Sequence, residues 1–332
     1  MAAPLAISLG DPAGIGPEVI AEAWARREAE SLAPFLCVGG AGLLQSAAAT
    51  RGISLPVQQI ATPDRALEVF GSALPVLGSG DCPWMPGLPN PEGARLAHDS
   101  LAAATALAVD GRAAGIVTAP IAKAELAAIG FAFPGQTEFV AQASGVEAAD
   151  AVMMLAGPSL RTVPMTVHCA LAEVSGRLSI DLIARRTRVV DRALRRDFGI
   201  AAPRIALTGL NPHAGENGRM GREEIEIIAP AISQLRGEGI DATGPHPADA
   251  LFTPRARAGY DVAIAMYHDQ ALVPLKALDF DEGVNVTLGL PIVRTSPDHG
   301  TAFAIAGKNE AHPGAMIAAI RMAGDMAARR RS

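Results

Sequence analysis

The feature that most constrains the fold is a regular alternation of short apolar runs with longer helical stretches. Between the runs, Ala, Glu, Arg and Leu dominate, as in the segments Asp99–Val109 and Ser179–Phe198. Buried parallel strands joined by amphipathic crossover helices have this pattern, so the sequence predicts an α/β fold. The apolar runs, each followed by Gly, Pro or Asp, are Leu5–Leu9, Phe35–Val38, Gly115–Thr118, Ala151–Leu155, Ile205–Gly209 and Val262–Met266.

Composition narrows the range of functions. The 332 residues are 49% hydrophobic and 19% charged, which is enough for a buried core and about two domains. A net charge of −6 argues against a non-specific grip on nucleic acid, which needs a basic surface. We expect no secretory signal and no membrane span, because the first residues carry no basic segment and every apolar run is short.

The cysteines indicate the cellular compartment of the protein. Cys37, Cys82 and Cys169 are odd in number and lack the CxxC pairs of zinc and redox motifs. Free thiols of this kind are typical of a reducing environment. We therefore expect a cytoplasmic protein with no membrane partner.

A glycine-rich turn follows the first predicted strand. In Gly10-Asp-Pro-Ala-Gly-Ile-Gly-Pro-Glu18 the proline suits the first turn of a helix, so a loop that approaches a ligand or a simple tight turn both fit. A dinucleotide fingerprint needs a further glycine where Val19 stands, and the segment 39–42 also misses the spacing. Any nucleotide must therefore be held in another way.

Three histidines follow strand-like runs, where open α/β sheets place ligand sites. His168 ends Thr166-Val-His168, His213 lies in a loop of turn-forming residues, and His268 follows a buried run directly. Three neutral imidazoles suit a catalytic Zn, Co, Ni or Fe ion with an open position. Their spacing is too wide for a local metal motif, so single hydrogen-bonded loop histidines are the alternative.

Cationic and amide side chains gather further along the chain. Lys276, Asn285 and Arg294 lie among Gly, Pro and Asn residues, just before Asp298-His-Gly-Thr301. A lysine and an arginine at strand ends can hold a carboxylate or phosphate, the arginine with two hydrogen bonds. The alternative is a solvated pair of surface cations.

Together these segments resemble the 4-hydroxythreonine-4-phosphate dehydrogenase family, whose members are NAD-dependent enzymes of pyridoxal phosphate biosynthesis. The resemblance runs along almost the whole chain and implies that His168, His213 and His268 bind a divalent metal. The motifs that carry it are Gly10–Glu18, Thr118-Ala-Pro-Ile-Ala-Lys123, Gly135-Gln-Thr-Glu138, Asn211-Pro-His-Ala-Gly-Glu-Asn-Gly218, Gly244-Pro-His-Pro-Ala-Asp249, Tyr267-His-Asp-Gln270, and Gly283-Val-Asn-Val-Thr-Leu-Gly-Leu-Pro291 through Arg294 to Thr301.

The resemblance also implies the remaining site residues. Asp249 and Asp269 are expected near the metal as the catalytic candidates, together with Lys276. The metal is expected to be Zn first, with Mg or Co as alternatives, and the cofactor NAD or NADP. The substrate contacts are expected to be Gln136, Thr137, Lys276, Asn285 and Arg294.

The implied fold is similar to isocitrate and isopropylmalate dehydrogenases, with two α/β/α lobes and the site in the cleft between them. Residues 1–130 with 286–332 are expected to form the outer lobe, and 131–285 a middle lobe with the metal ligands and dimer contacts. The partner is expected to be a second copy in a homodimer that completes the active site. The reaction implied is oxidation of 4-phosphonooxy-L-threonine at C3, followed by decarboxylation to 3-amino-2-oxopropyl phosphate.

Two departures from the family pattern affect substrate preference. Gln136 stands where the family has a histidine, and His246 stands where an apolar residue is expected. A glutamine donates a hydrogen bond but carries no charge. A related dehydrogenase for a four-carbon sugar-acid phosphate or a dihydrodiol carboxylate is therefore the alternative function. Outside this family, a metal-dependent hydrolase or aldolase and a two-lobed ligand-binding protein are the competing classes.

Overall fold

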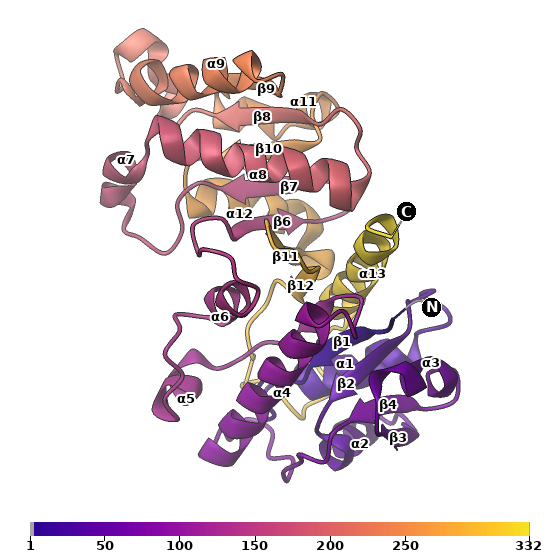
Figure 1. The fold of residues 1–332 in the computed structure, drawn as a ribbon. Helices are drawn as coiled ribbons and strands as arrows, with labels where there is room; N and C mark the ends of the chain where they lie inside the picture. The colour runs from indigo at the N-terminus through magenta and orange to yellow at the C-terminus, as the bar shows by residue number, and fades with distance from the viewer. Residues whose placement is uncertain (1–2, 332) are drawn as a thin grey trace. The chain divides into compact units, whose positions relative to one another are not determined.

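The computed structural model describes residues 3–331 and divides them into two compact units (Figure 1). Unit 1 comprises the chain up to Ala148 together with the part from Leu290 onward, and unit 2 comprises Ala149–Gly289. Each unit is a β-sheet with helices packed against it, which confirms the predicted α/β class. No helix among residues 3–331 is long and apolar enough to cross a membrane.

Unit 1 contains an all-parallel sheet in the order β3-β4-β2-β1-β5-β12. The four residues of β1 are all buried, as expected of a strand covered on both faces. The strands are β1 (Leu5–Ser8), β2 (Phe35–Val38), β3 (Val57–Ile60), β4 (Leu74–Leu77), β5 (Ile116–Thr118) and β12 (Arg294–Pro297).

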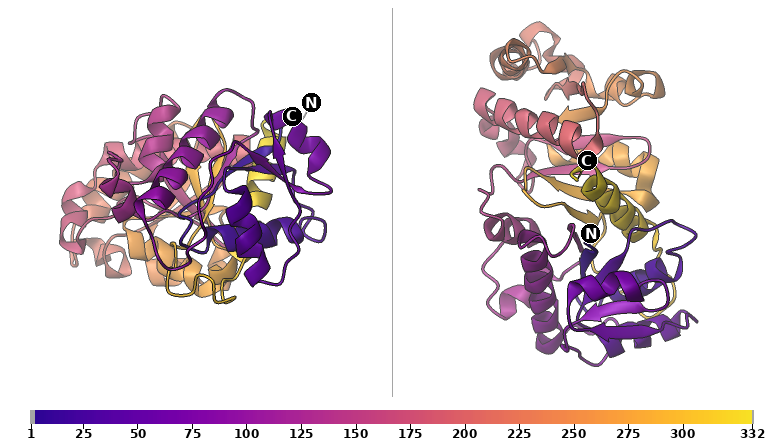
Figure 2. Two further views of the ribbon diagram at one scale, coloured as in Figure 1. Left: turned by 90° about the horizontal axis from the view of Figure 1, so that it is seen from below. Right: turned by 45° about the vertical axis from the view of Figure 1, so that its right-hand side comes forward.

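The helices of unit 1 bring distant parts of the chain together. α13 packs on β12, β5 and β1, so Figure 2 shows the yellow C-terminal helix beside the indigo N-terminal strands. α4 packs on β1, β2 and β5, and its Asn90 side chain caps it by accepting from the Gly93 N–H. The helices are α1 (Gly16–Ala25), α2 (Ala41–Thr50), α3 (Ala66–Val69), α4 (Pro91–Val109), α5 (Lys123–Ala128), α6 (Gln136–Ala143) and α13 (Gly314–Arg329), with the 3₁₀ turn η1 (Pro63–Arg65).

Unit 2 contains a mixed sheet in the order β11-β6-β7-β10-β8-β9. β7, β10, β8 and β9 are parallel, whereas β6 is antiparallel to both β7 and β11. The β6–β7 hairpin is a departure from the purely parallel pattern predicted. The strands are β6 (Val152–Ala156), β7 (Arg161–Pro164), β8 (Arg204–Thr208), β9 (Asp241–His246), β10 (Val262–Ala265) and β11 (Val284–Leu288).

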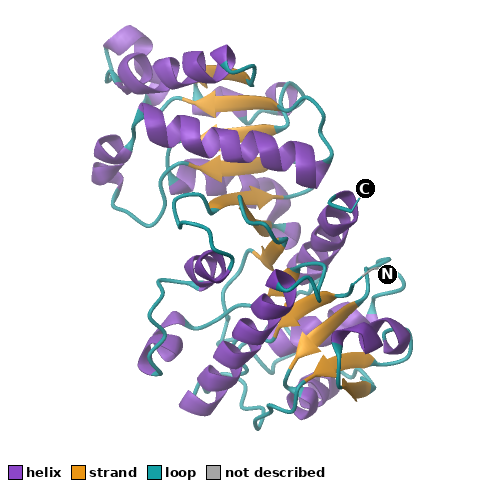
Figure 3. Cartoon of the chain, in the orientation of Figure 1, coloured by secondary structure: helices purple, strands orange, loops and turns teal. Residues whose placement is uncertain are grey.

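Helices cover both faces of the sheet in unit 2, with α8 on one face and α12 on the other (Figure 3). α8 begins at a serine cap, Ser179, and ends at Gly199 in the left-handed conformation. The helical elements are η2 (Leu171–Glu173), α7 (Val174–Arg177), α8 (Ile180–Phe198), η3 (Pro212–Gly218), η4 (Glu224–Ile228), α9 (Ala229–Gly237), α10 (Ala248–Leu251), α11 (Pro254–Arg257), α12 (His268–Asp279) and η5 (Phe280–Glu282).

The unit boundaries differ from those predicted at residues 130 and 285. Residues 131–148 belong to unit 1 because α6 packs against α4 there. Residues 286–289 belong to unit 2 because β11 pairs with β6 through Leu288. Both ends of the chain lie in one unit, and the middle of the chain forms the other.

Candidate active site

The three predicted metal ligands all lie in unit 2, after the carboxyl ends of neighbouring strands. His168 follows β7, His213 follows β8, and His268 begins α12 after β10. Since β7, β10 and β8 are parallel and adjacent, these three ends meet at one edge of the sheet. That edge is where ligands bind in open α/β sheets.

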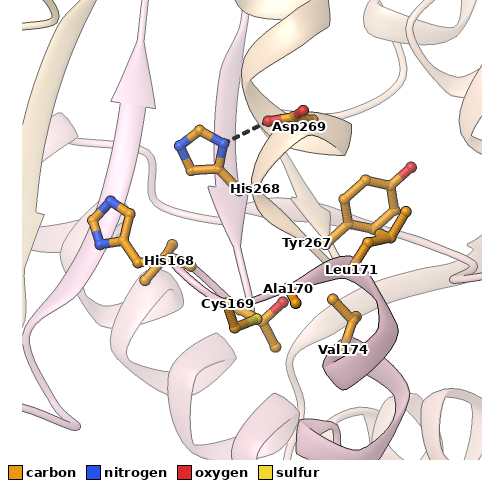
Figure 4. Close-up of a pocket in the computed structure, with 10 residues that line it drawn as sticks. His168, Cys169, Ala170, Leu171, Val174, Tyr267, His268 and Asp269 are labelled. Carbon is orange, nitrogen blue, oxygen red and sulfur yellow. Dashed lines mark hydrogen bonds and ion pairs between the residues drawn. The ribbon is translucent and has the colours of Figure 1, made fainter.

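His168 and His268 face one pocket of about 410 Å³ (Figure 4). Their ring centroids are 6.0 Å apart, and Leu171, Val174 and Tyr267 line the same pocket. Nδ1 of His268 lies 2.7 Å from the Asp269 carboxylate, and its other ring nitrogen points away from that carboxylate (Figure 4). A carboxylate behind a histidine in this way fixes the tautomer and is typical of metal-binding imidazoles.

His213 lies in a neighbouring pocket of about 350 Å³ with Asp249, Gln270 and Tyr267. Tyr267 lines both this pocket and that of His168 and His268. Within residues 3–331, no three His, Cys, Asp or Glu side chains are close enough to hold one ion together. The structure thus pairs two of the three predicted ligands and places the third in the adjoining pocket.

The two aspartates differ in their surroundings. The Asp269 side chain is 76% exposed and is already bonded to His268, so it is suited to orienting that imidazole. Asp249, on α10, lines the pocket of His213 and is exposed to solvent. Asp249 is therefore the aspartate of the pair that lines the same pocket as His213.

The predicted substrate residues divide between the two units. Lys276 on α12 and Asn285 on β11 belong to unit 2, whereas Gln136, Thr137 and Arg294 belong to unit 1. The Asn285 side-chain oxygen is buried without a hydrogen-bond partner among residues 3–331, so it is open to a ligand donor. The Lys276 ammonium lies 6.0 Å from the centre of the Phe280 ring.

Arg294 forms the centre of the group in unit 1. It is only 4% exposed and donates to the hydroxyls of Thr118, at 2.9 Å, and Thr137, at 3.3 Å. Burial lowers its pKa to about 10, against the opposing charge of Glu138. A buried guanidinium at this place is able to form paired hydrogen bonds with a phosphate or a carboxylate.

Gln136 complements this arginine from the first turn of α6. Its Nε2 donates to the carbonyl of Ala119 at 3.0 Å, while its Oε1 is buried with no partner among residues 3–331. The glutamine is 9% exposed, so that oxygen is shielded from bulk water. Thr137 and Arg294 therefore suit a phosphate or a carboxylate, while the Gln136 oxygen beside them suits a hydrogen-bond donor.

The glycine-rich turns form no phosphate cradle. The amide groups of Gly42 and Leu43, at the start of α2, donate to the Asp81 carboxylate at 2.6 and 3.2 Å. Gly10 has a positive φ of 71°, and a Cβ there would lie 2.5 Å from the Pro120 carbonyl oxygen. The structure therefore gives a steric reason for a glycine at position 10.

The sequence analysis missed three polar residues that hold the site segments in place. Thr118 accepts from Arg294, and Glu224 and Gln270 bind the backbone around the His213 loop. Thr118 and Gln270 lie inside motifs quoted above, so their place in those motifs could have indicated a role in the site. Glu224 carried no motif, and its role depends on tertiary contacts.

Comparison with known proteins identifies the family. The model of the family described as "Pyridoxal phosphate biosynthetic protein PdxA" matches residues 30–323. The chain belongs to the PdxA family. This confirms the resemblance drawn from the motifs.

Relatives of the chain match it over nearly their whole length. A protein of Erythrobacter litoralis (strain HTCC2594) named 4-hydroxythreonine-4-phosphate dehydrogenase is 62% identical, covering 98% of this chain and 97% of its own. The crystal structure of a protein of that name from Klebsiella pneumoniae is 39% identical, with a TM-score of 0.86 and 98% of each chain covered. A terephthalate 1,2-cis-dihydrodiol dehydrogenase from Burkholderia xenovorans LB400 is 31% identical, with a TM-score of 0.66 and again 98% of each chain covered.

Proposed function

We propose that this protein is a 4-hydroxythreonine-4-phosphate dehydrogenase. It oxidises the C3 hydroxyl of 4-phosphonooxy-L-threonine with NAD or NADP, and the resulting β-keto acid loses CO₂ to give 3-amino-2-oxopropyl phosphate. The name shared by relatives of up to 62% identity supports the substrate. The observation that carries the proposal is the buried Arg294 beside Gln136 and Thr137, because a guanidinium held there can form paired hydrogen bonds with a phosphate or a carboxylate.

We assign substrate binding to Arg294, Gln136 and Thr137, and Lys276 and Asn285 remain predicted contacts. Arg294 supplies a planar guanidinium that forms paired hydrogen bonds with a phosphate or a carboxylate. The Gln136 oxygen accepts a hydrogen bond from a protonated group of the substrate, since it has no partner among residues 3–331. Holding both charged ends of the substrate fixes the position of C3 for its oxidation.

Proton transfer rests on the residues of unit 2. Asp249 accepts the proton of the C3 hydroxyl, directly or through water, while Asp269 orients His268. We assign a divalent cation, Zn first and Mg or Co as alternatives, to His168, His213 and His268. The His168–His268 pair fits this assignment because the two rings share a pocket and a carboxylate supports His268. Such an ion lowers the pKa of a bound hydroxyl and stabilises negative charge on oxygen.

The proposal extends to assembly and location. We propose a cytoplasmic homodimer in which the second copy completes the active site. Sedimentation of the purified protein at several concentrations tests this part. A monomer at assay concentrations that is fully active would contradict it.

The decisive experiment is NADH formation, followed by its ultraviolet absorbance. The purified protein is assayed with NAD or NADP and 4-phosphonooxy-L-threonine, before and after chelation and with each metal added back. We expect production of NADH or NADPH that chelation abolishes and that added metal restores. His168→Ala should remove it, whereas His98→Ala, a change on α4 of unit 1, should not. Absence of reduced cofactor with every metal would refute the proposal.

The relative named as a dihydrodiol dehydrogenase supports one alternative substrate class, a cyclic dihydrodiol carboxylate. Gln136, which is neutral where the family has a histidine, is the residue on which this alternative depends. The same assay with dihydrodiol carboxylates and sugar-acid phosphates distinguishes the two. Calorimetric titration with NAD distinguishes these two dehydrogenase functions from a metal-dependent hydrolase, which binds no nicotinamide.

A further inference from the structure

A group of charged side chains lies at the edge of the unit 2 sheet opposite the three histidines. Arg161 is the first residue of β7, Arg204 is the first residue of β8, and Asp261 directly precedes β10. Because β7, β10 and β8 are parallel and adjacent, these residues gather at the amino ends of the strands. This group is therefore separate from the candidate active site at the carboxyl ends.

The carboxylate of Asp261 is occupied by one of these two arginines. It accepts from Nε of Arg204 at 3.2 Å, from Nη2 at 3.0 Å and from the Arg204 N–H at 2.8 Å. The backbone carbonyl of Asp261 accepts from Nη1 of Arg161 at 3.4 Å. Arg204 therefore compensates the negative charge of Asp261, whereas Arg161 donates to a neutral carbonyl.

Arg161 and Arg257 both line a pocket of about 70 Å³ beside this group. Ser159 of the β6–β7 hairpin, Tyr260 and Asp261 also line it. Burial raises the pKa of Tyr260 to about 12, against the opposing charge of Arg257, so the phenol brings no negative charge at neutral pH. Among the described lining residues Asp261 is the only acid, and Arg204 already binds its carboxylate.

Arg257, the last residue of α11, forms no ion pair among residues 3–331. Its Nη1 donates to the Ser159 carbonyl at 3.1 Å, which leaves Nη2 with no hydrogen-bond partner in the described part of the chain. Its Nε is buried and likewise lacks an acceptor there. A guanidinium with unused donors is suited to an oxyanion, because its planar fork forms two parallel hydrogen bonds with the oxygens.

We propose that this pocket binds a phosphate group, held by Arg257 and Arg161 at the amino edge of the sheet. A phosphate group carries a charge of about −1.5 to −2 at neutral pH and directs its oxygens at donors from two elements, which suits two guanidinium groups. The ligand must be small, since cofactor pockets usually measure about 300–1,000 Å³. The inference does not rest on the proposed dehydrogenase function, because every lining residue lies at the other edge of the unit 2 sheet.

The alternative is that Arg257 only joins α11 to the β6–β7 hairpin, and phosphate affinity distinguishes the two. The titrations use the Arg294→Met protein, because that change removes the anion-binding arginine of unit 1. Arg257→Met is added to this background. Arg255→Met is the matched control, since Arg255 is an exposed arginine of the same helix that does not line the pocket. Each full-length protein is titrated with inorganic phosphate by calorimetry at constant ionic strength.

We expect the Arg294→Met protein to bind inorganic phosphate. Adding Arg257→Met should weaken this binding by about 10- to 100-fold, because charge-assisted hydrogen bonds are lost. Adding Arg255→Met should leave the affinity nearly unaltered. Equal weakening by both changes would show that phosphate responds only to diffuse positive charge, and absence of binding by the Arg294→Met protein would show that the pocket takes no phosphate. Either result overturns the inference.

Arg161→Met provides a second test that keeps the bond between Arg257 and Ser159, and it decides the question if the Arg257→Met protein does not fold. It should also weaken phosphate binding, and an unaltered affinity would overturn a site built on two arginines. A parallel titration with glycerol phosphate distinguishes a phosphate monoester from the free ion as the source of the group. Acetate, a planar monoanion, should bind more weakly than phosphate, and equal affinity would overturn the assignment to phosphate.

Discussion

The guanidinium of Arg294 donates to the Thr118 hydroxyl at 2.9 Å, and both side chains are almost completely buried. Burial lowers the pKa of Arg294 to about 10, so the guanidinium stays charged at neutral pH but its charge costs more in the folded protein than in water. A charge held at such a cost in an interior site is typical of ligand binding.

Replacing this residue therefore separates stability from function. We expect Arg294→Met to lower kcat/KM by about 100-fold or more, since two or more charge-assisted hydrogen bonds are lost. The free energy of unfolding without substrate should rise, because no charge is then buried. Arg65→Met, at an exposed pair with Glu68, is the control and should leave both quantities nearly unchanged. A destabilised Arg294→Met protein would contradict the argument.

The sequence predicted the strands of this protein better than its site geometry. All six apolar runs proved to be strands, because period and turn residues are local properties. The assignment of Gln136 and Thr137 to unit 1 was not predicted, since it depends on which helices pack together. α6 illustrates this: only its contact with α4 assigns it to unit 1.

The loop of His213 shows a different limit of sequence reasoning. From His213 to Asn217 every φ is positive, between 44° and 75°, although only Gly215 tolerates this without strain. The turn-forming composition indicated a loop but not five left-handed residues in succession. The Glu224 carboxylate lies against this loop at Gly215 and accepts from the N–H groups of Leu210 and Asn211 before it.

Two substitutions at His213 distinguish the effect of losing the imidazole from the effect of relieving the strained backbone. His213→Ala and His213→Gly should both abolish turnover, because each removes a proposed metal ligand. We expect His213→Gly to be more stable than His213→Ala by about 1 kcal/mol, since glycine adopts a φ of 52° without a Cβ clash. Urea unfolding of the two metal-free variants measures the difference. Equal stabilities would mean that the loop carries no such strain.

Glu224 is expected to determine whether this loop keeps its shape. Its carboxylate also accepts from the Asn211 side chain at 3.0 Å, so Glu224→Gln presents an amino group to a donor. We expect a loss of about 1–3 kcal/mol in the free energy of unfolding. Glu226→Gln, on the exposed side of the same segment, should cost less than about 0.5 kcal/mol. Similar losses of unfolding free energy in both variants would show that Glu224 does not hold this loop.

Asp11, in the turn after β1, provides a test by pH. Its carboxyl is 3% exposed and accepts from the Ala13 N–H at 2.9 Å. Burial raises its pKa, an effect that the Ala13 hydrogen bond reduces and the negative charge of Glu125 reinforces. Because the folded protein binds this proton more tightly than the unfolded chain, Asp11 stabilises the fold at low pH and loses that contribution as the pH rises through its raised pKa.

The neutral isostere Asp11→Asn keeps the acceptor for Ala13 and lacks the titration. We expect it to be more stable than the unaltered protein at pH 7, by a margin that shrinks as the pH falls through the raised pKa towards the ordinary value of 3.8. Urea unfolding of both proteins across this range gives the margin directly. A margin that stayed constant or grew on acidification would mean that the carboxylate of Asp11 is stabilised, not penalised, in the folded protein.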